Sequence, residues 1–171
     1  MLLDTLLEVR RRSEALISGL EPEDLGLQGM ADASPPKWHL AHTTWFFDTF
    51  VLQPHLASHT PCDPRWSYQF NSYYEAVGER HPRSERGVLS RPTIREILQW
   101  RADVDAGLIQ LLGNKPSQEL RTLVELGLQH EQQHQELLLM DLLDGFSRQP
   151  LEPIYGDEAD LKTCLLYTSP S

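Results

Sequence analysis

Two histidines four residues apart, His130 and His134, are the side chains of this sequence best spaced to bind a metal ion. They lie in a stretch from Glu119 to Leu143 that lacks proline and is rich in leucine, glutamate and glutamine, which predicts a helix. Positions i and i+4 of a helix share one face, with Cβ atoms about 5–6 Å apart. Two imidazoles can therefore reach one ion, and the pair forms half of a site that needs a third ligand.

The third ligand is expected from residues 38–47, where His39 and His42 stand three residues apart. His42 shares a helical stripe with three aromatic residues, Trp38, Trp45 and Phe46, so it is the better candidate to point into the core. His39 can also reach inward, and either histidine can instead be a core residue beside aromatic rings. Three neutral imidazoles leave coordination positions open, which suits Fe(II), Zn(II), Ni(II) or Cu(II) in a catalytic site.

Glu136 follows two residues after His134. On a helix it points roughly 200° away from that histidine, so it would not bind the same ion. The prediction is that Glu136 accepts an N–H from a histidine of a neighbouring helix; the alternative is a solvated charge.

Four helices are expected to position these residues, over about 2–17, 36–52, 93–112 and 117–144. Ser34 before two prolines, the Thr93–Glu96 capping box and Ser117 mark three of the helix starts. Pro54 and Gly145 mark two of the ends. The connection over 53–91 is long and has one possible short helix near 67–77. The pattern predicts an all-α four-helix bundle with a long crossover loop, a fold that builds metal sites from inward-facing side chains of different helices.

Composition restricts the class of protein. The chain has 171 residues, 40% of them hydrophobic, which is enough for one domain with a core. Its net charge of −10 argues against nucleic acid or an anionic membrane as the main partner, and no apolar run approaches the about 20 residues of a membrane span. Two cysteines, Cys62 and Cys164, form no disulfide framework, and the N-terminus lacks the apolar core of a signal peptide. A cytoplasmic protein is expected.

The end of the chain differs from the rest. Residues 161–171 show no helical period, and we interpret them as a non-native tail translated from foreign DNA; the alternative is an ordinary frayed terminus. Residues 1–155 are then the one metal-binding bundle, and the chain is expected to be a fragment of a longer protein.

Three separated motifs carry a resemblance to a known family. They are residues 34–42 (SPPKWHLAH), residues 70–78 (FNSYYEAVG) and the HxxxHxE pattern of His130, His134 and Glu136. Together they resemble the N-terminal DinB-like domain of the ergothioneine-type sulfoxide synthases, over about residues 5–155.

The resemblance implies a nonheme iron(II) site held by His42, His130 and His134. Such enzymes use O2 to join the sulfur of a thiol, γ-glutamylcysteine or cysteine, to the imidazole carbon of hercynine, and the resulting sulfoxide is later cleaved to ergothioneine. It also implies that Gln133 lies near hercynine. Arg83 and Arg86 match, less securely, two arginines that bind the carboxylates of the thiol; the alternative for this pair is a surface position.

Full-length members of that family continue into a C-terminal domain resembling formylglycine-generating enzymes, which supplies the catalytic tyrosine. This chain ends before it, so the protein is expected to be an iron-dependent oxidoreductase whose 171-residue part is inactive alone. Ovothiol-type and selenoneine-type relatives share the metal domain and stay open as alternatives. So do a stand-alone DinB-like thiol transferase that uses Zn(II) or Ni(II), and a nonenzymatic helical module with structural histidines.

Overall fold

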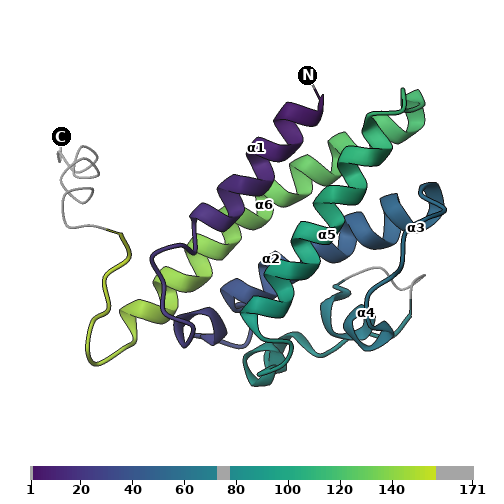
Figure 1. Cartoon of the computed structure of the whole chain (residues 1–171). Coiled ribbons are helices and arrows are strands. Elements are labelled where there is room, and N and C mark those ends of the chain that lie inside the picture. The colour runs from purple at the N-terminus through teal and green to yellow at the C-terminus, as the bar shows by residue number, and fades with distance from the viewer. Residues whose placement is uncertain (1, 73–77, 157–171) are drawn as a thin grey trace, which may run out of the picture.

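Four long helices form a bundle in the computed structural model, which describes residues 2–72 and 78–156 (Figure 1). They are α1 (Leu2–Ala15), α2 (Pro36–Phe46), α5 (Ile94–Leu112) and α6 (Gln118–Ser147). No strand occurs within the described ranges. The predicted all-α fold is confirmed, whereas residues 161–171 and the middle of the 70–78 motif lie outside the described part of the chain.

Side-chain caps start α5 and α6 as predicted. Thr93 and Glu96 form a reciprocal capping box, and the Ser117 side chain accepts from the backbone of Leu120. The prediction of a Ser34 cap for α2 was wrong, because Pro35 is the N-cap residue and no side chain caps this end. Ser34 instead donates its backbone N–H to Asp141 and accepts at Oγ from an arginine, contacts that tie the start of α2 to other elements.

Two residues that were predicted to mark helix ends, Pro54 and Gly145, lie within helical segments instead. Pro54 lies in the first turn of α3 (Gln53–His55), where a proline is tolerated, and the π-helical turn η2 (Phe47–Leu52) joins it to α2. Helix α6 continues through Gly145 to Ser147. A Cβ at position 145 would lie 2.6 Å from Leu27 Cδ2, so this glycine permits close packing and does not end the helix.

In its described residues, the crossover between α3 and α5 carries two short helices, α4 (Pro64–Phe70) and the 3-10 turn η4 (Arg83–Val88). Of the helix expected near 67–77, residues 67–70 lie in α4, which begins earlier, at Pro64, while residues 73–77 lie outside the described part of the chain. A third short turn, η1 (Asp24–Gly26), lies in the connection from α1 to α2. The crossover brings Phe70 and the arginines of η4 to the same end of the bundle as the first turns of α2.

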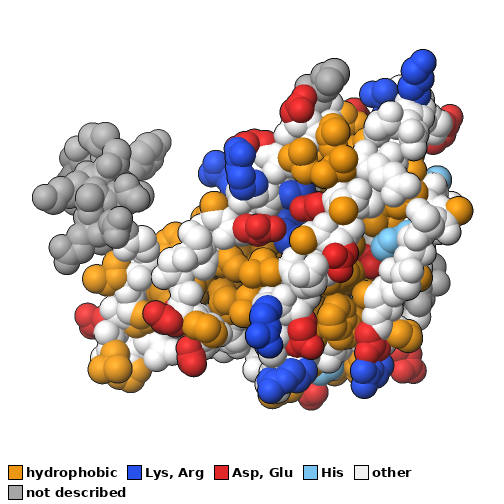
Figure 2. Space-filling model, viewed as in Figure 1, with side chains coloured by type: hydrophobic (Ala, Val, Ile, Leu, Met, Phe, Trp, Pro, Cys, Tyr) orange, Lys and Arg blue, Asp and Glu red, His pale blue; other side chains and the backbone are white. Residues whose placement is uncertain are grey.

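Helix α2 lies at the centre of the bundle, with all but one of its residues buried. Gly127 of α6 lets the end of α2 and the start of η2 approach closely: a Cβ there would lie 2.9 Å from Phe46 Cε1 and 2.6 Å from Phe47 Cε1. On the face shown in Figure 2, charged side chains cover the helix surfaces and hydrophobic ones fill the spaces between them. None of the helices in the described ranges is long and apolar enough to cross a membrane.

Candidate metal site

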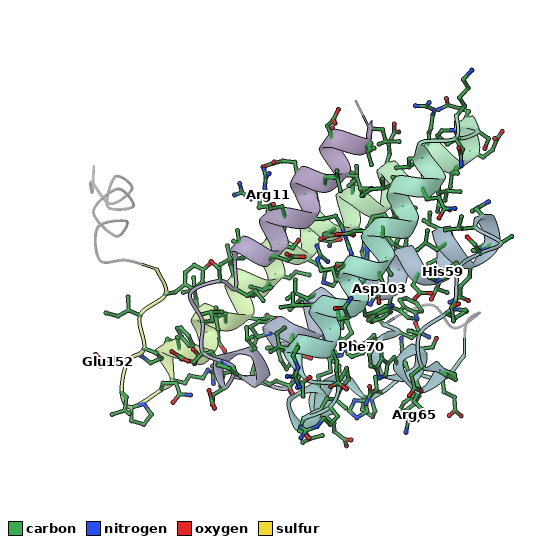
Figure 3. The ribbon with its side chains drawn as sticks, in the orientation of Figure 1. Arg11, His59, Arg65, Phe70, Asp103 and Glu152 are labelled. Atoms are coloured by element: carbon green, nitrogen blue, oxygen red, sulfur yellow. The ribbon has the colours of Figure 1, made fainter. Side chains whose placement is uncertain are left out.

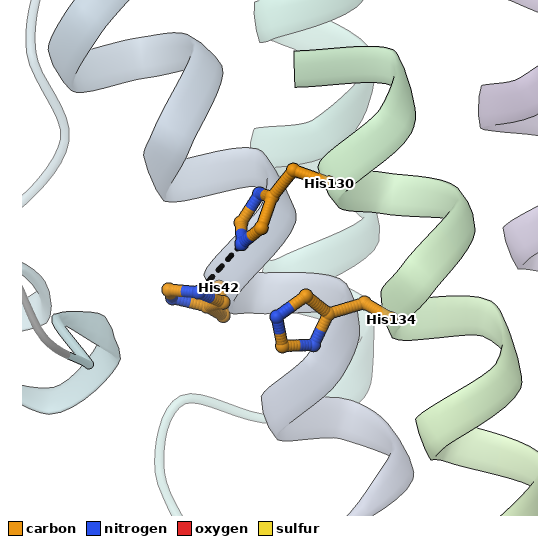
Figure 4. Close-up of side chains that lie close together, drawn as sticks. All are labelled: His42, His130 and His134. Atoms are coloured by element: carbon orange, nitrogen blue, oxygen red, sulfur yellow. Dashed lines mark hydrogen bonds between the residues drawn. The ribbon is translucent and has the colours of Figure 1, made fainter. Parts of the chain in front are cut away.

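Three histidines meet where α2 packs against α6. His42 comes from α2, and His130 and His134 come from successive turns of α6 (Figure 4). Each offers one ring nitrogen, and these three nitrogens lie within 4.8 Å of one another. The three residues predicted from spacing and from the aromatic stripe are thus brought together, in a group that could hold a metal ion.

The hydrogen bonds of His42 orient its ring. Its Nδ1 lies 2.6 Å from the carbonyl oxygen of Phe70, and a carbonyl only accepts, so Nδ1 carries the proton. The lone pair of the neutral ring is then on Nε2, which lies 3.1 Å from Nε2 of His130. The Trp38 ring stacks on the imidazole at 4.7 Å between centroids and covers its face. The carbonyl of Phe70, from the crossover, therefore leaves the lone pair of His42 on Nε2, where it could bind a metal ion.

Burial keeps the three rings neutral. It lowers the pKa of His42 well below its usual value, and it lowers the pKa of His130 from 6.5 to about 4. Burial also lowers the pKa of His134, and the neighbouring histidines add to the effect. Neutral imidazoles are the form that binds metal. His130 Nδ1 is buried with no hydrogen-bond partner among the described residues. An unpaired buried nitrogen of this kind is expected where the ring binds a group such as a metal ion.

A cavity of about 300 Å³ opens on the histidines. Arg86, on its wall, is buried, with its guanidinium carbon 3.4 Å above the Trp38 ring and Nη1 donating to Ser34 Oγ at 2.8 Å. Arg83 is exposed at the same cavity. The full lining is Trp38, His39, His42, Ser72, Arg83, Arg86, His130, Gln133, His134 and Leu137. Two cationic side chains thus lie beside three neutral metal-binding groups.

The two other predicted residues of α6 lie in different places. Gln133 is exposed and lines the histidine cavity. Glu136 is also exposed, but it borders a separate hollow against α1, together with Glu8 and Arg12. Glu136 therefore lies outside the histidine site.

Asp141 is a carboxylate that contacts His39, a histidine beside the three of the site. His39 points inward, as one of the two options for that residue allowed, with Nε2 3.1 Å from Asp141 Oδ2 and Nδ1 2.9 Å from His134 Nδ1. Sequence reasoning gave Asp141 no role. A signal was present, because Asp141 lies seven residues after His134 and so falls on the same face of α6.

A larger hollow of about 700 Å³ lies between α5 and residues 56–63, away from the three histidines. Asp48, a buried carboxylate that contacts the lining residues His59 and Trp100, already accepts from both of them and from Gln53. In the described part of the chain, the histidine trio is the only group with metal-binding geometry. The smaller cavity, which opens on these three histidines, is therefore the better candidate for the functional site.

Comparison with known proteins agrees with this placement. A search of curated proteins found no match. A family model of the DinB superfamily matches residues 5–138, a range that includes all three histidines. Proteins of this superfamily are often metal-dependent enzymes. The match covers well over half of the sequence, and the chain belongs to the DinB superfamily.

Proposed function

We propose that this chain is the metal-binding domain of a nonheme iron(II), O2-dependent sulfoxide synthase that joins a thiol to hercynine. The observation that carries the proposal is the cavity itself, in which three neutral histidines lie beside two arginines and a glutamine. Iron(II), O2 and a thiol of the γ-glutamylcysteine or cysteine class would be the cofactor and substrates. A second domain of the same enzyme would complete the hercynine pocket.

The ligand set suits this chemistry. His42, His130 and His134 would hold the ion, and a neutral three-histidine set leaves it a net positive charge. When bound, iron(II) would supply the redox chemistry for O2 and would favour the thiolate form of the substrate. The Trp38 ring stacks on His42 and covers one face of it, and part of the cavity wall is apolar.

Each arginine would have a distinct part in binding the thiol. Arg86 is buried and oriented by Ser34 and Trp38, so its guanidinium is held in one place before substrate arrives. Arg83 is exposed and can swing toward a carboxylate at the mouth. A single arginine can bind a carboxylate through two parallel N–H donors, which fixes orientation as well as position. We assign to Gln133, which lines the same cavity, a contact with hercynine.

The proposed reaction balances. A new carbon–sulfur bond replaces the S–H bond of the thiol and the C–H bond of the hercynine imidazole. One atom of O2 becomes the sulfoxide oxygen, and the other leaves as water with the two hydrogens. The thiol and hercynine together lose four electrons, and O2 gains them.

A second candidate is a metal-dependent thiol transferase that uses Zn(II) or Ni(II). The observation that favours it is that the histidines and both arginines come from one domain, so a thiol can be bound and activated without a partner domain. The two candidates differ in their second substrate. Only the sulfoxide synthase binds hercynine and needs O2.

The test uses the chain loaded anaerobically with Fe(II) and nitric oxide, followed by electron paramagnetic resonance of the nitrosyl complex. We expect γ-glutamylcysteine or cysteine to change the signal, and hercynine to change it again when the second domain of the enzyme is present to complete its pocket. With that domain present, a response to thiol without any response to hercynine would favour the transferase. No response to either thiol would contradict both candidates.

Substitution of Arg83 tests the contact with the thiol. Arg83→Gln should weaken thiol binding about tenfold, since a hydrogen bond to a charged group contributes about 1.5 kcal/mol. Arg95→Gln is the matched control, because Arg95 is exposed on α5 and does not line the cavity. Equal thiol affinities in the two variants would remove Arg83 from the proposed site.

A further inference from the structure

Beside His134, a buried chain of hydrogen bonds links α6 to α2 and to Ser34, which lies just before α2. The backbone N–H of Ser34 donates to Asp141 Oδ2 at 2.8 Å. The same oxygen lies 3.1 Å from His39 Nε2, and His39 Nδ1 lies 2.9 Å from His134 Nδ1. Ser34, His39 and Asp141 are each buried.

The direction of each hydrogen bond follows from one fixed donor. A backbone N–H only donates, so Asp141 Oδ2 is an acceptor, and the proton between it and His39 is on Nε2 of the histidine. A neutral His39 then has its lone pair on Nδ1. That lone pair accepts from Nδ1–H of His134, which leaves the lone pair of His134 on Nε2.

We propose that His39 and Asp141 are positioning residues for the metal site, which direct Nε2 of His134 toward the ion. The inference rests on the three-histidine metal site proposed above. His39 would act only through His134 and would not bind the ion. His39 and Asp141 together would do for His134 what the Phe70 carbonyl does for His42.

The positioning chain also reaches the cavity wall. Ser34 donates to Asp141 through its backbone and accepts from Arg86 through its side chain. The start of α2 thus fixes both a partner of the metal ligand and an arginine of the cavity. Partners of metal-binding histidines commonly set the tautomer and the ring orientation, and their loss weakens metal binding about 10–100-fold.

The first readout needs no metal. Long-range ¹⁵N NMR of the metal-free chain should find His134 protonated on Nδ1. His39→Phe removes the acceptor, so the proton of His134 should shift toward Nε2. His39→Asn keeps an oxygen near the former Nδ1 position and should restore the Nδ1–H form.

The second readout is Zn(II) affinity, measured by competition with a chromophoric chelator. His39→Phe and Asp141→Leu should each weaken binding about 10–100-fold, whereas His39→Asn should stay within about threefold of the wild type. His59→Phe is the matched control. It removes a histidine with the same 3.1 Å contact to a buried aspartate, Asp48, at the other hollow, and it should change neither readout.

Circular dichroism of each variant separates loss of fold from loss of positioning. His134 protonated on Nε2 in the wild type, or an unchanged tautomer in a folded His39→Phe chain, would overturn the inference. Failure of thiol or hercynine binding would count against the proposed function alone, because neither the tautomer nor Zn(II) affinity depends on substrate.

Discussion

Two neighbouring residues of α6, His130 and Glu131, belong to two polar clusters in the interior of the bundle. The two clusters differ in how their polar groups are accommodated away from water. The histidine cluster consists of His39, His42, His130 and His134. The glutamate cluster consists of Arg10, Ser13, Arg101 and Glu131. One is built from neutral rings and the other from paired charges, although one helix supplies both.

The glutamate cluster is fully paired. Glu131 is 1% exposed, accepts from Arg10 at 3.0 Å and from Ser13 at 2.6 Å, and forms an ion pair with Arg101. Burial alone would raise the pKa of Glu131, but the two guanidinium groups outweigh it and lower the pKa to about 2. The cluster joins α1, α5 and α6 by charge.

The histidine cluster has no such excess of opposite charge. Its one carboxylate, Asp141, contacts His39 and none of the three candidate ligands in the described structure. Burial therefore holds the rings neutral, with nitrogen lone pairs available to a ligand. From this difference we infer that the charge pairs of the bundle serve stability. The neutral imidazole rings, whose nitrogen lone pairs are not held by an opposite charge, mark the place where a ligand would bind.

The largest expected effect is on the glutamate cluster. Glu131→Gln should lower the free energy of unfolding by about 3–5 kcal/mol, because it leaves Arg10 and Arg101 buried without their counter-charge. Urea unfolding of the metal-free chain measures it. Glu136→Gln, an exposed change on the same helix, should stay within about 0.5 kcal/mol of the wild type. A loss below about 1 kcal/mol for Glu131→Gln would mean that the ion pairs do not hold the bundle together.

The two clusters should also respond to acid in different pH ranges. The pKa of His130 falls from 6.5 to about 4 on folding, so the unfolded chain binds this proton more readily and stability decreases as the pH falls from 6.5 to 4. The slope is up to about 1.4 kcal/mol per pH unit for each such histidine. The pKa of Glu131 falls from 4.5 to about 2, so its contribution is present above pH 4.5 and is lost between 4.5 and 2.

Urea unfolding at a series of pH values separates these ranges. His130→Leu should flatten the dependence between pH 6.5 and 4, and Glu131→Gln should flatten it below 4.5. If His130→Leu left the upper range unchanged, the histidine would not be held neutral by burial.

A smaller effect is expected when a ring of the histidine cluster is replaced in the metal-free chain. His130→Leu should change the free energy of unfolding at pH 7 by less than about 1 kcal/mol, or stabilise the chain, since it removes a buried Nδ1 that has no partner in the described structure. Thermal unfolding without metal measures the change. A loss as large as that of Glu131→Gln would show that the two clusters serve stability alike.

The sequence predicted the histidine cluster better than the glutamate cluster, for a physical reason. Local periodicity placed His130 and His134 on one helix face and made His42 the better candidate for the third ligand, with His39 left open. The full set of three was implied by the family resemblance. Glu131 pairs with Arg10 and Arg101, which are 121 and 30 residues away in the sequence. The local sequence pattern cannot distinguish a glutamate that is solvated from one that is buried and paired over such separations. Of the run Arg10-Arg11-Arg12, only Arg10 is buried, while Arg11 lies on the outside of α1 (Figure 3). Contacts that depend on how the helices are arranged in space, including the contact from His39 to Asp141, could be found only in the tertiary structure.

The central claim is that three histidines of two helices bind one metal ion. Anaerobic titration of the chain with Fe(II), followed by isothermal calorimetry, tests it most directly. We expect one ion per chain, and His42→Ala should weaken binding by more than about 100-fold, beyond the usual loss for a residue that only orients a ligand. Unchanged affinity in a folded His42→Ala chain would contradict the three-histidine site.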